Sequence, residues 1–179
     1  MLRLLFRSSV VYFLLIFNFI FTEQIFISDL EINAGDSGII QLSVTNENVL
    51  GGFQFQITDF PNQGFFENVV GTDRTSSFTV SFNEQADGSL IIVGFDLTGA
   101  GLSAGEGSIL ELTYVSTGIY TSEIEVSLNE TNTVLSNLLG VSLDYTFENS
   151  FIKSNQYSSG QDLLRSVAPL CKTILPEEL

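Results

Sequence analysis

The segment from Gly51 to Thr58 places its hydrophobic side chains at every second position. It reads Gly-Gly-Phe-Gln-Phe-Gln-Ile-Thr, so Phe53, Phe55 and Ile57 share one side of an extended strand, and glutamine and threonine share the other. Successive side chains of a β-strand point to opposite faces, so the alternation predicts a strand with one buried face. Because the pattern recurs along the chain, we expect an all-β sandwich.

Short alternating segments separated by turn residues continue from Ile25 onward. This rhythm is typical of sandwiches and jelly rolls. It predicts a jelly-roll β-sandwich of about nine antiparallel strands with no helix of any length between them. The expected strands cover residues 25–32, 39–45, 52–58, 65–70, 78–83, 89–95, 109–117, 123–128, 133–136 and 143–147.

Two of these segments lack a simple two-sided pattern. The run from Leu90 to Phe95 is apolar at both parities, which indicates a strand covered on one face by the opposing sheet and on the other by a loop or a partner. In the strand that starts at Ile109, the inward set is either Leu110, Leu112 and Tyr114 or the alternate positions. The sequence leaves the register of this second strand open.

The chain divides into three parts. Residues 1–22 carry a positive flank and then an apolar run shorter than a bilayer span, a pattern that predicts a signal peptide or an N-terminal anchor. Residues 25–149 form the expected sandwich. Residues 150–179 lose the alternation and are interpreted as an irregular C-terminal tail, in which Cys171 is an unpaired thiol.

Charge and composition exclude several functions. The 21 acidic residues outnumber the 6 basic ones, and between Asp29 and Asn149 Arg74 is the single basic residue among 17 acidic ones. Such a surface repels nucleic acid, so no nucleic-acid partner is expected. The chain has no histidine and one cysteine, which excludes Ser-His-Asp and Cys-His catalysis, Cys/His zinc sites and internal disulfides.

Four stretches together carry a family resemblance. They are Ile-Ser-Asp-Leu at 27–30 with Ala-Gly-Asp at 34–36, Val-Leu-Gly-Gly-Phe-Gln-Phe-Gln-Ile at 49–57, Val-Gly-Phe at 93–95, and Gly-Ser-Ile-Leu-Glu-Leu-Thr-Tyr at 107–114. In this order and spacing, over residues 25–147, the chain resembles a cohesin domain. The resemblance implies a jelly roll related in shape to cellulose-binding modules, found in extracellular polysaccharide-degrading systems, whose usual task is to dock a dockerin module.

The resemblance also implies a binding surface, formed by the outward residues of one sheet. On the third, fifth, sixth and eighth strands the candidate partner-binding residues are Gln54, Gln56, Thr79, Ser81, Asn83, Glu123 and Glu125. A flat polar face of this kind can hydrogen-bond a partner helix, and it can equally be an ordinary solvated sheet face. We therefore expect a non-catalytic module, exported to the extracellular space or cell surface, with a dockerin-like protein partner. Contact with a membrane is expected only through an uncleaved N-terminal segment.

Two alternative functions stay open. A carbohydrate-binding module that takes a polysaccharide would need a line of exposed aromatic side chains, for which Tyr114, Tyr120 and Tyr145 are the candidates. The third alternative is an acidic structural or adhesive domain without a specific ligand.

Catalytic and metal sites are weakly indicated. Glu123 and Glu125 lie two positions apart on one strand, so their side chains point side by side and cannot flank a sugar as glycosidase carboxylates do. No enzyme activity and no cofactor are therefore expected. The sequence leaves room for a structural Ca²⁺ at loop ends that carry carboxylates, namely Asp29, Asp36, Asp73 and Asp96.

Overall fold

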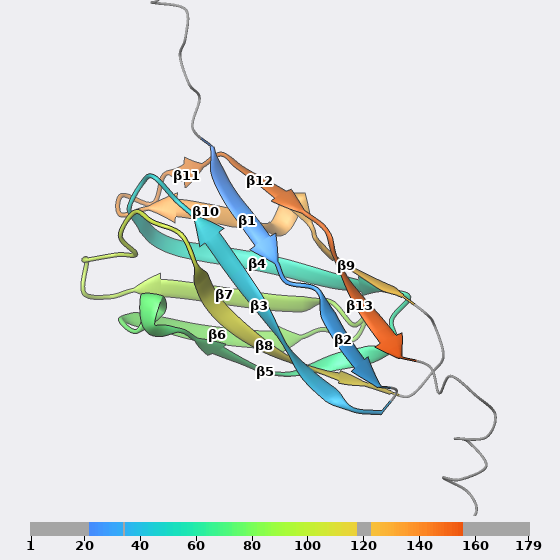
Figure 1. Ribbon diagram of the computed structural model, residues 1–179. Helices are drawn as coiled ribbons and strands as arrows, with labels where there is room; N and C mark the ends of the chain where they lie inside the picture. The colour runs from blue at the N-terminus through green and yellow to red at the C-terminus, as the bar shows by residue number, and fades with distance from the viewer. Residues whose placement is uncertain (1–21, 34, 118–122, 156–179) are drawn as a thin grey trace, which may run out of the picture.

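The computed structural model describes residues 22–33, 35–117 and 123–155. Tyr120, Cys171, residues 1–21 of the predicted leader (1–22) and residues 156–179 of the predicted tail (150–179) lie outside the described residues. Among the described residues no helix is long and apolar enough to cross a membrane. These residues form two single-turn 3-10 helices, η1 (Asp73–Thr75) and η2 (Glu130–Asn132), and thirteen strands (Figure 1): β1 (Glu23–Ile27), β2 (Leu30–Asn33), β3 (Ser37–Thr45), β4 (Leu50–Phe60), β5 (Gly64–Gly71), β6 (Phe78–Glu84), β7 (Leu90–Asp96), β8 (Ser108–Ser116), β9 (Ile124–Leu128), β10 (Val134–Asn137), β11 (Ser142–Leu143), β12 (Tyr145–Glu148) and β13 (Ser150–Asn155).

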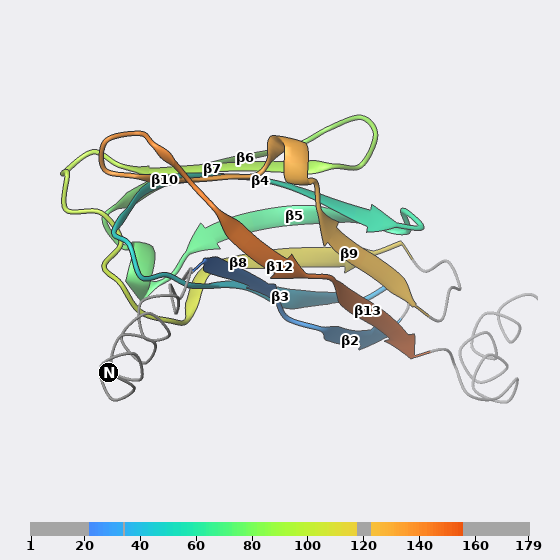
Figure 2. The same cartoon turned by 90° about the horizontal axis from the view of Figure 1, so that it is seen from above.

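The strands form two layers, which confirms the predicted all-β sandwich. A five-stranded sheet has the order β12-β1-β3-β8-β5, and an eight-stranded sheet contains β11-β10-β4-β9-β13-β2 with β7 and β6 added beside β4. Strands β10 and β9 pair with successive parts of one edge of β4, and β7 pairs with its other edge. Figure 2 shows β10, β4, β7 and β6 together as one layer of the sandwich.

The pairing is not purely antiparallel, because the first and last strands of the described chain run side by side. β1 pairs with β12 in parallel in the five-stranded sheet, and β2 pairs with β13 in parallel in the eight-stranded sheet. Both chain segments therefore cross from one sheet to the other together. The Asp29 carboxylate accepts a hydrogen bond from the backbone N–H of Phe151 at 2.9 Å at this crossing.

This crossing corrects three sequence-based boundaries. The segment predicted as one strand at 25–32 is two strands, because the chain changes sheets after Ile27. The segment predicted at 143–147 is divided between β11 and β12, which belong to different sheets. The sandwich also continues beyond residue 149, because β13 fills the place between β9 and β2 although its sequence has only two apolar residues.

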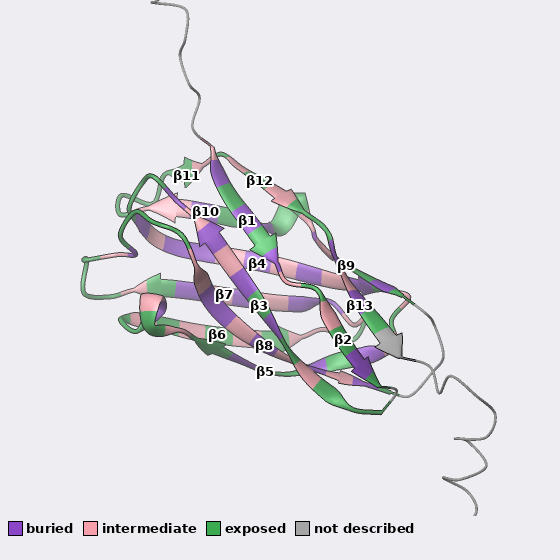
Figure 3. Cartoon of the chain, in the orientation of Figure 1, coloured by how far each residue is buried: buried purple, intermediate pink, exposed green. Residues whose placement is uncertain are grey.

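The core lies between the sheets and is built from the alternating apolar positions, as Figure 3 shows along β3, β4 and β8. Phe53, Phe55 and Ile57 are all buried, as their parity predicts. On β8 the open choice of register resolves to Leu110, Leu112 and Tyr114 facing inward. Burial of such side chains is the main source of sandwich stability.

One guanidinium holds the loops at one end of the sandwich. The Arg74 side chain on η1 donates to the backbone oxygens of Val44, Gly107 and Ser103 and to the Asn46 side-chain oxygen, at 2.8–3.3 Å. These acceptors come from the end of β3 and from the loop that precedes β8. The single basic residue of the acidic segment therefore has a structural role.

Candidate docking surface

Four strands of the eight-stranded sheet present a continuous outer face. Register places Ser81, Val93, Gln54 and Val134 in one row across β6, β7, β4 and β10. A neighbouring row has Asn83, Ile91 and Gln56, and the row on the other side has Thr79, Phe95, Gly52 and Ser136. We call these eleven residues the docking face.

An apolar strip runs along the middle of the docking face. Ile91, Val93 and Phe95 occupy the outward positions of β7, and Phe95 is 40% exposed. Across β4, Val134 is 37% exposed. Between them lies a shallow hollow of about 300 Å³ lined by Gly52, Phe53, Gln54, Val93, Gly94, Phe95, Val134 and Ser136. The outward apolar side chains of β7, which the sequence led us to expect under a loop or a partner, are therefore uncovered in the described chain.

The edge strand β6 supplies polar groups beside this strip. Thr79, Ser81 and Asn83 are exposed, while the residues that alternate with them pack against the core. Within the described residues, the side chains of these three make no hydrogen bond. Two hydroxyls and one amide are thus free to pair with a ligand at no cost in broken internal hydrogen bonds.

The two glutamines of β4 are already engaged. Gln54 donates to the backbone oxygen of Asn132 on η2 at 3.0 Å, and the Gln56 side-chain oxygen accepts from the Asn132 amide at 2.6 Å. The Gln56 amide also donates to the Ser89 hydroxyl at 3.0 Å. These bonds hold η2 at the border of the docking face, so Gln54 and Gln56 act as rigid parts of the surface.

Glu123 and Glu125 lie apart from the other five predicted residues. Glu123 directly precedes β9, and Glu125 pairs with Phe60, three residues beyond the last position of β4 that pairs with β7. The Glu125 carboxylate accepts a hydrogen bond from the Asn149 amide at 2.5 Å. The structure therefore brings Gln54, Gln56, Thr79, Ser81 and Asn83 together and leaves the two glutamates outside the docking face.

The turn that follows β10 adds apolar side chains at one end of the docking face. Leu139 is 88% exposed, and Leu138 and Val141 are also exposed. The Asn137 side chain shapes this turn by accepting hydrogen bonds from the backbone N–H groups of Leu139 and Val141. Leu97, after β7, is exposed as well. The sequence analysis assigned none of these side chains to a surface.

Aromatic side chains are divided between the core and the surface. Phe53, Phe55 and Phe66 are buried, but Phe65 and Phe95 are about 40% exposed because they occupy outward positions of β5 and β7. Tyr114, a candidate for sugar stacking, is fully buried, since it is one of the inward residues of β8. Tyr145 is half-buried on β12.

Two carboxyl groups with raised pKa values, those of Asp59 and Glu84, are hydrogen-bonded to residues of the five-stranded sheet. Tyr114 donates to the Asp59 carboxylate at 3.0 Å, and burial raises the pKa of Asp59. Burial also raises the pKa of Glu84, which accepts from the backbone N–H of Phe66 at 2.9 Å. Asp59 is only 7% exposed and Glu84 is half-buried, so the Asp59 carboxylate has little of the access to substrate that catalysis needs.

Two of the four aspartates proposed for Ca²⁺, Asp36 and Asp96, serve local turns, and Asp29 bonds to Phe151 at the sheet crossing. Asp96 accepts from the backbone N–H groups of Thr98 and Gly101, and Asp36 accepts from the Asn33 amide at 2.8 Å. In the part of the chain that the structure describes, no three His, Cys, Asp or Glu residues gather closely enough to hold a metal ion.

Comparisons with known proteins identify the fold. No protein-family model and no curated protein sequence matches the chain. Among solved structures, a non-cellulosomal cohesin from the archaeon Archaeoglobus fulgidus matches with a TM-score of 0.65 and 15% identity, over 81% of this chain and 98% of that one. The sixth cohesin of Acetivibrio cellulolyticus scaffoldin B, in complex with a dockerin, matches with a TM-score of 0.64 and 15% identity, over 75% and 100%. A type I cohesin from a Clostridium thermocellum cohesin–dockerin complex matches with a TM-score of 0.64 and 14% identity, over 76% and 95%. The described domain thus has the cohesin fold.

Proposed function

We propose that this chain is a non-catalytic docking module that binds a dockerin-type helical protein through the docking face. The observation that carries the proposal is the pairing of an uncovered apolar strip on β7 with free polar side chains on β6, on a cohesin fold. Two of the similar structures are complexes of a cohesin with a dockerin. Fold alone does not define function, so the surface itself has to supply the argument.

The composition of the docking face suits a protein partner. Interfaces bury an apolar centre and surround it with polar groups that form hydrogen bonds. Ile91, Val93 and Phe95 provide the centre, and Thr79, Ser81 and Asn83 provide the polar border. A glycan would instead need a line of exposed rings, and Phe95 is the one aromatic residue among the eleven residues of the docking face, while the exposed Phe60 lies at the far end of β4. A protein partner is therefore favoured over a polysaccharide.

Charge defines the partner further. In the described part of the chain the basic residues are Arg74, whose guanidinium is bound to loop oxygens, and Lys153. A strongly acidic surface accelerates association with a basic partner and rejects an acidic one. The partner is expected to carry lysine and arginine around its apolar contact residues.

The setting we propose is extracellular or at the cell surface, in a polysaccharide-degrading or adhesive system. Its support is the leader-like pattern of residues 1–22.

A matched pair of valine substitutions tests the proposal. Val93→Asp places a carboxylate in the apolar strip, whereas Val115→Asp places one at a half-buried outward position of β8 in the other sheet. Binding to a panel of recombinant dockerin modules is measured by biolayer interferometry, alongside retention on polysaccharide gels. Burying an unpaired charge costs about 2–3 kcal/mol, so Val93→Asp should weaken binding about 30- to 150-fold and Val115→Asp less than about 2-fold. Equal binding by the two variants, or retention by a glycan alone, would contradict the proposal.

A further inference from the structure

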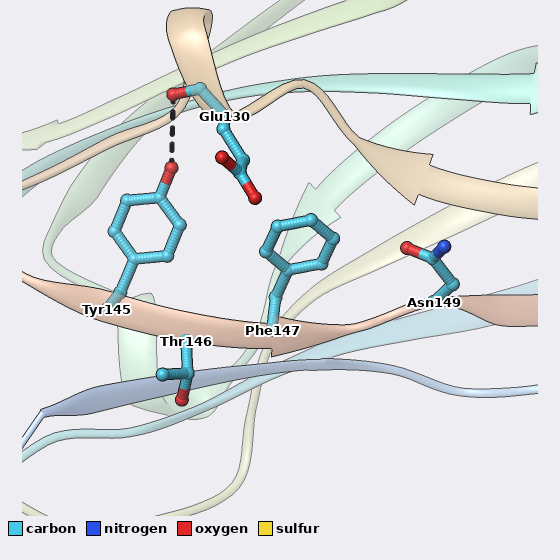
Figure 4. Close-up of a pocket in the computed structure, with 5 residues that line it drawn as sticks. All are labelled: Glu130, Tyr145, Thr146, Phe147 and Asn149. Carbon is cyan, nitrogen blue, oxygen red and sulfur yellow. Dashed lines mark hydrogen bonds between the residues drawn. The ribbon is translucent and has the colours of Figure 1, made fainter.

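A second concave site lies on the flank of the sandwich, where β12 faces η2. It is an open pocket of about 640 Å³ lined by Glu130, Tyr145, Thr146, Phe147 and Asn149. Figure 4 shows the rings of Tyr145 and Phe147 side by side and directed toward η2, with the Glu130 carboxylate above the space between them. The Thr146 side chain points the other way, as the alternation of a strand requires.

The walls of this pocket are held in place. The Tyr145 hydroxyl lies 3.2 Å from the backbone oxygens of both Glu130 and Thr133, so its ring is tied to the two ends of η2. Phe147 packs against the core, and the Asn149 amide donates to Glu125. A preformed site loses little conformational entropy when a ligand enters.

The chemistry of the pocket favours a cation. The Glu130 carboxylate makes no hydrogen bond among the described residues, and Glu125 adds a second carboxylate at the Asn149 end. The Glu130 carboxylate lies beside the Tyr145 ring in the pocket, and burial, followed by that charge, raises the pKa of Tyr145. Aromatic faces attract guanidinium and ammonium groups, and carboxylates pair with them. A neutral sugar would gain nothing from the surrounding negative charge.

We infer that this pocket binds the guanidinium or ammonium group of an arginine or lysine side chain on the docked partner. The helix η2 separates the two sites, because its Asn132 is bonded to Gln54 and Gln56 of the docking face while Glu130 lines the pocket. A partner on the docking face is therefore next to the pocket. This inference rests on the proposed function for the source of the cation, but the pocket can be tested without any partner.

The test is an NMR titration of the full chain with N-acetyl-arginine-N-methylamide, using the citrulline analogue as the neutral control probe. Saturable shifts at residues 130 and 145–149 with a Kd of about 1–10 mM are expected from the arginine probe and none from citrulline. Glu130→Gln should raise the Kd about fivefold. Glu148→Gln removes the same charge from the opposite side of β12 and should change the Kd less than about 1.5-fold.

Three results would overturn the inference: equal shifts from the citrulline probe, equal effects of the two glutamine variants, or saturation of the pocket by cellotetraose in place of the cation. Val93→Asp should leave the arginine titration unchanged, since it alters only the docking face. Loss of dockerin binding with retained arginine binding would therefore separate the two sites.

Discussion

Replacing Arg74 tests whether this residue stabilises the domain through hydrogen-bond geometry or only through its charge. Its two terminal nitrogens donate to Val44 and Gly107 oxygens at 2.8 and 3.0 Å and to Asn46 and Ser103 oxygens at 2.8 and 3.3 Å. A planar guanidinium fits four acceptors in this arrangement, whereas an ammonium group cannot reach them together. The two explanations therefore predict different effects of lysine at this position.

The magnitude follows from these contacts. Each hydrogen bond contributes about 0.5–1.5 kcal/mol net, and since the side chain is half-buried, the lower part of that range applies. Arg74→Ala should lower the free energy of unfolding by about 2–3 kcal/mol and Arg74→Lys by about 1–2 kcal/mol. With a urea m-value of about 2 kcal/mol per molar, the midpoint of unfolding should fall by about 1–1.5 M for alanine.

The assay is urea unfolding followed by circular dichroism at low and high salt. The loss in Arg74→Lys should persist at high salt, because it arises from geometry. If Arg74→Lys unfolds at the wild-type midpoint, within about 0.2 M, the positive charge alone explains the stabilisation and the argument from geometry is refuted.

Two further predictions concern the interior. Burial raises the pKa of Asp59 and Glu84 from ordinary values of 3.8 and 4.5, so their contribution to stability is full below those values and is lost as the pH rises through the folded-state values. The urea midpoint of wild type should therefore decline toward neutral pH more steeply than that of Asp59→Asn. Equal slopes in the two proteins would refute this linkage. A methyl group at Gly94 would stand 2.1 Å from the Phe53 ring. Gly94→Ala should therefore lower the free energy of unfolding, measured with heat or urea, by about 1–3 kcal/mol. An unchanged midpoint would show that the ring is free to move.

The fold could be predicted from sequence because the local alternation of apolar and polar residues determines most of it. The alternation at Phe53, Phe55 and Ile57 assigned both the strand and its buried face, and the same reasoning placed Thr79, Ser81 and Asn83 outward on β6. The change of sheets after Ile27 could not be predicted, because a crossing depends on a parallel partner more than 100 residues away, where Phe151 bonds to Asp29. For the same reason β13 was missed.

The candidate site was harder to predict than the fold. Parity showed that Gln54 and Gln56 face outward, but it could not show that Asn132 of η2 occupies their amides. The sequence of β7 is apolar on both faces of the strand, which was a usable signal. It was interpreted only as a sign that both faces are covered by other segments or a partner. The pocket at Tyr145 and Phe147 brings together β12, η2 and Asn149, and their proximity depends on how the two sheets meet.

The central claim is that a dockerin-type partner binds the outer face of β6, β7, β4 and β10. Amide hydrogen exchange of the free domain and of its complex with a captured dockerin module tests it most directly. We expect new protection on these four strands and none on β3 and β8 of the other sheet. Protection confined to the five-stranded sheet would contradict the account.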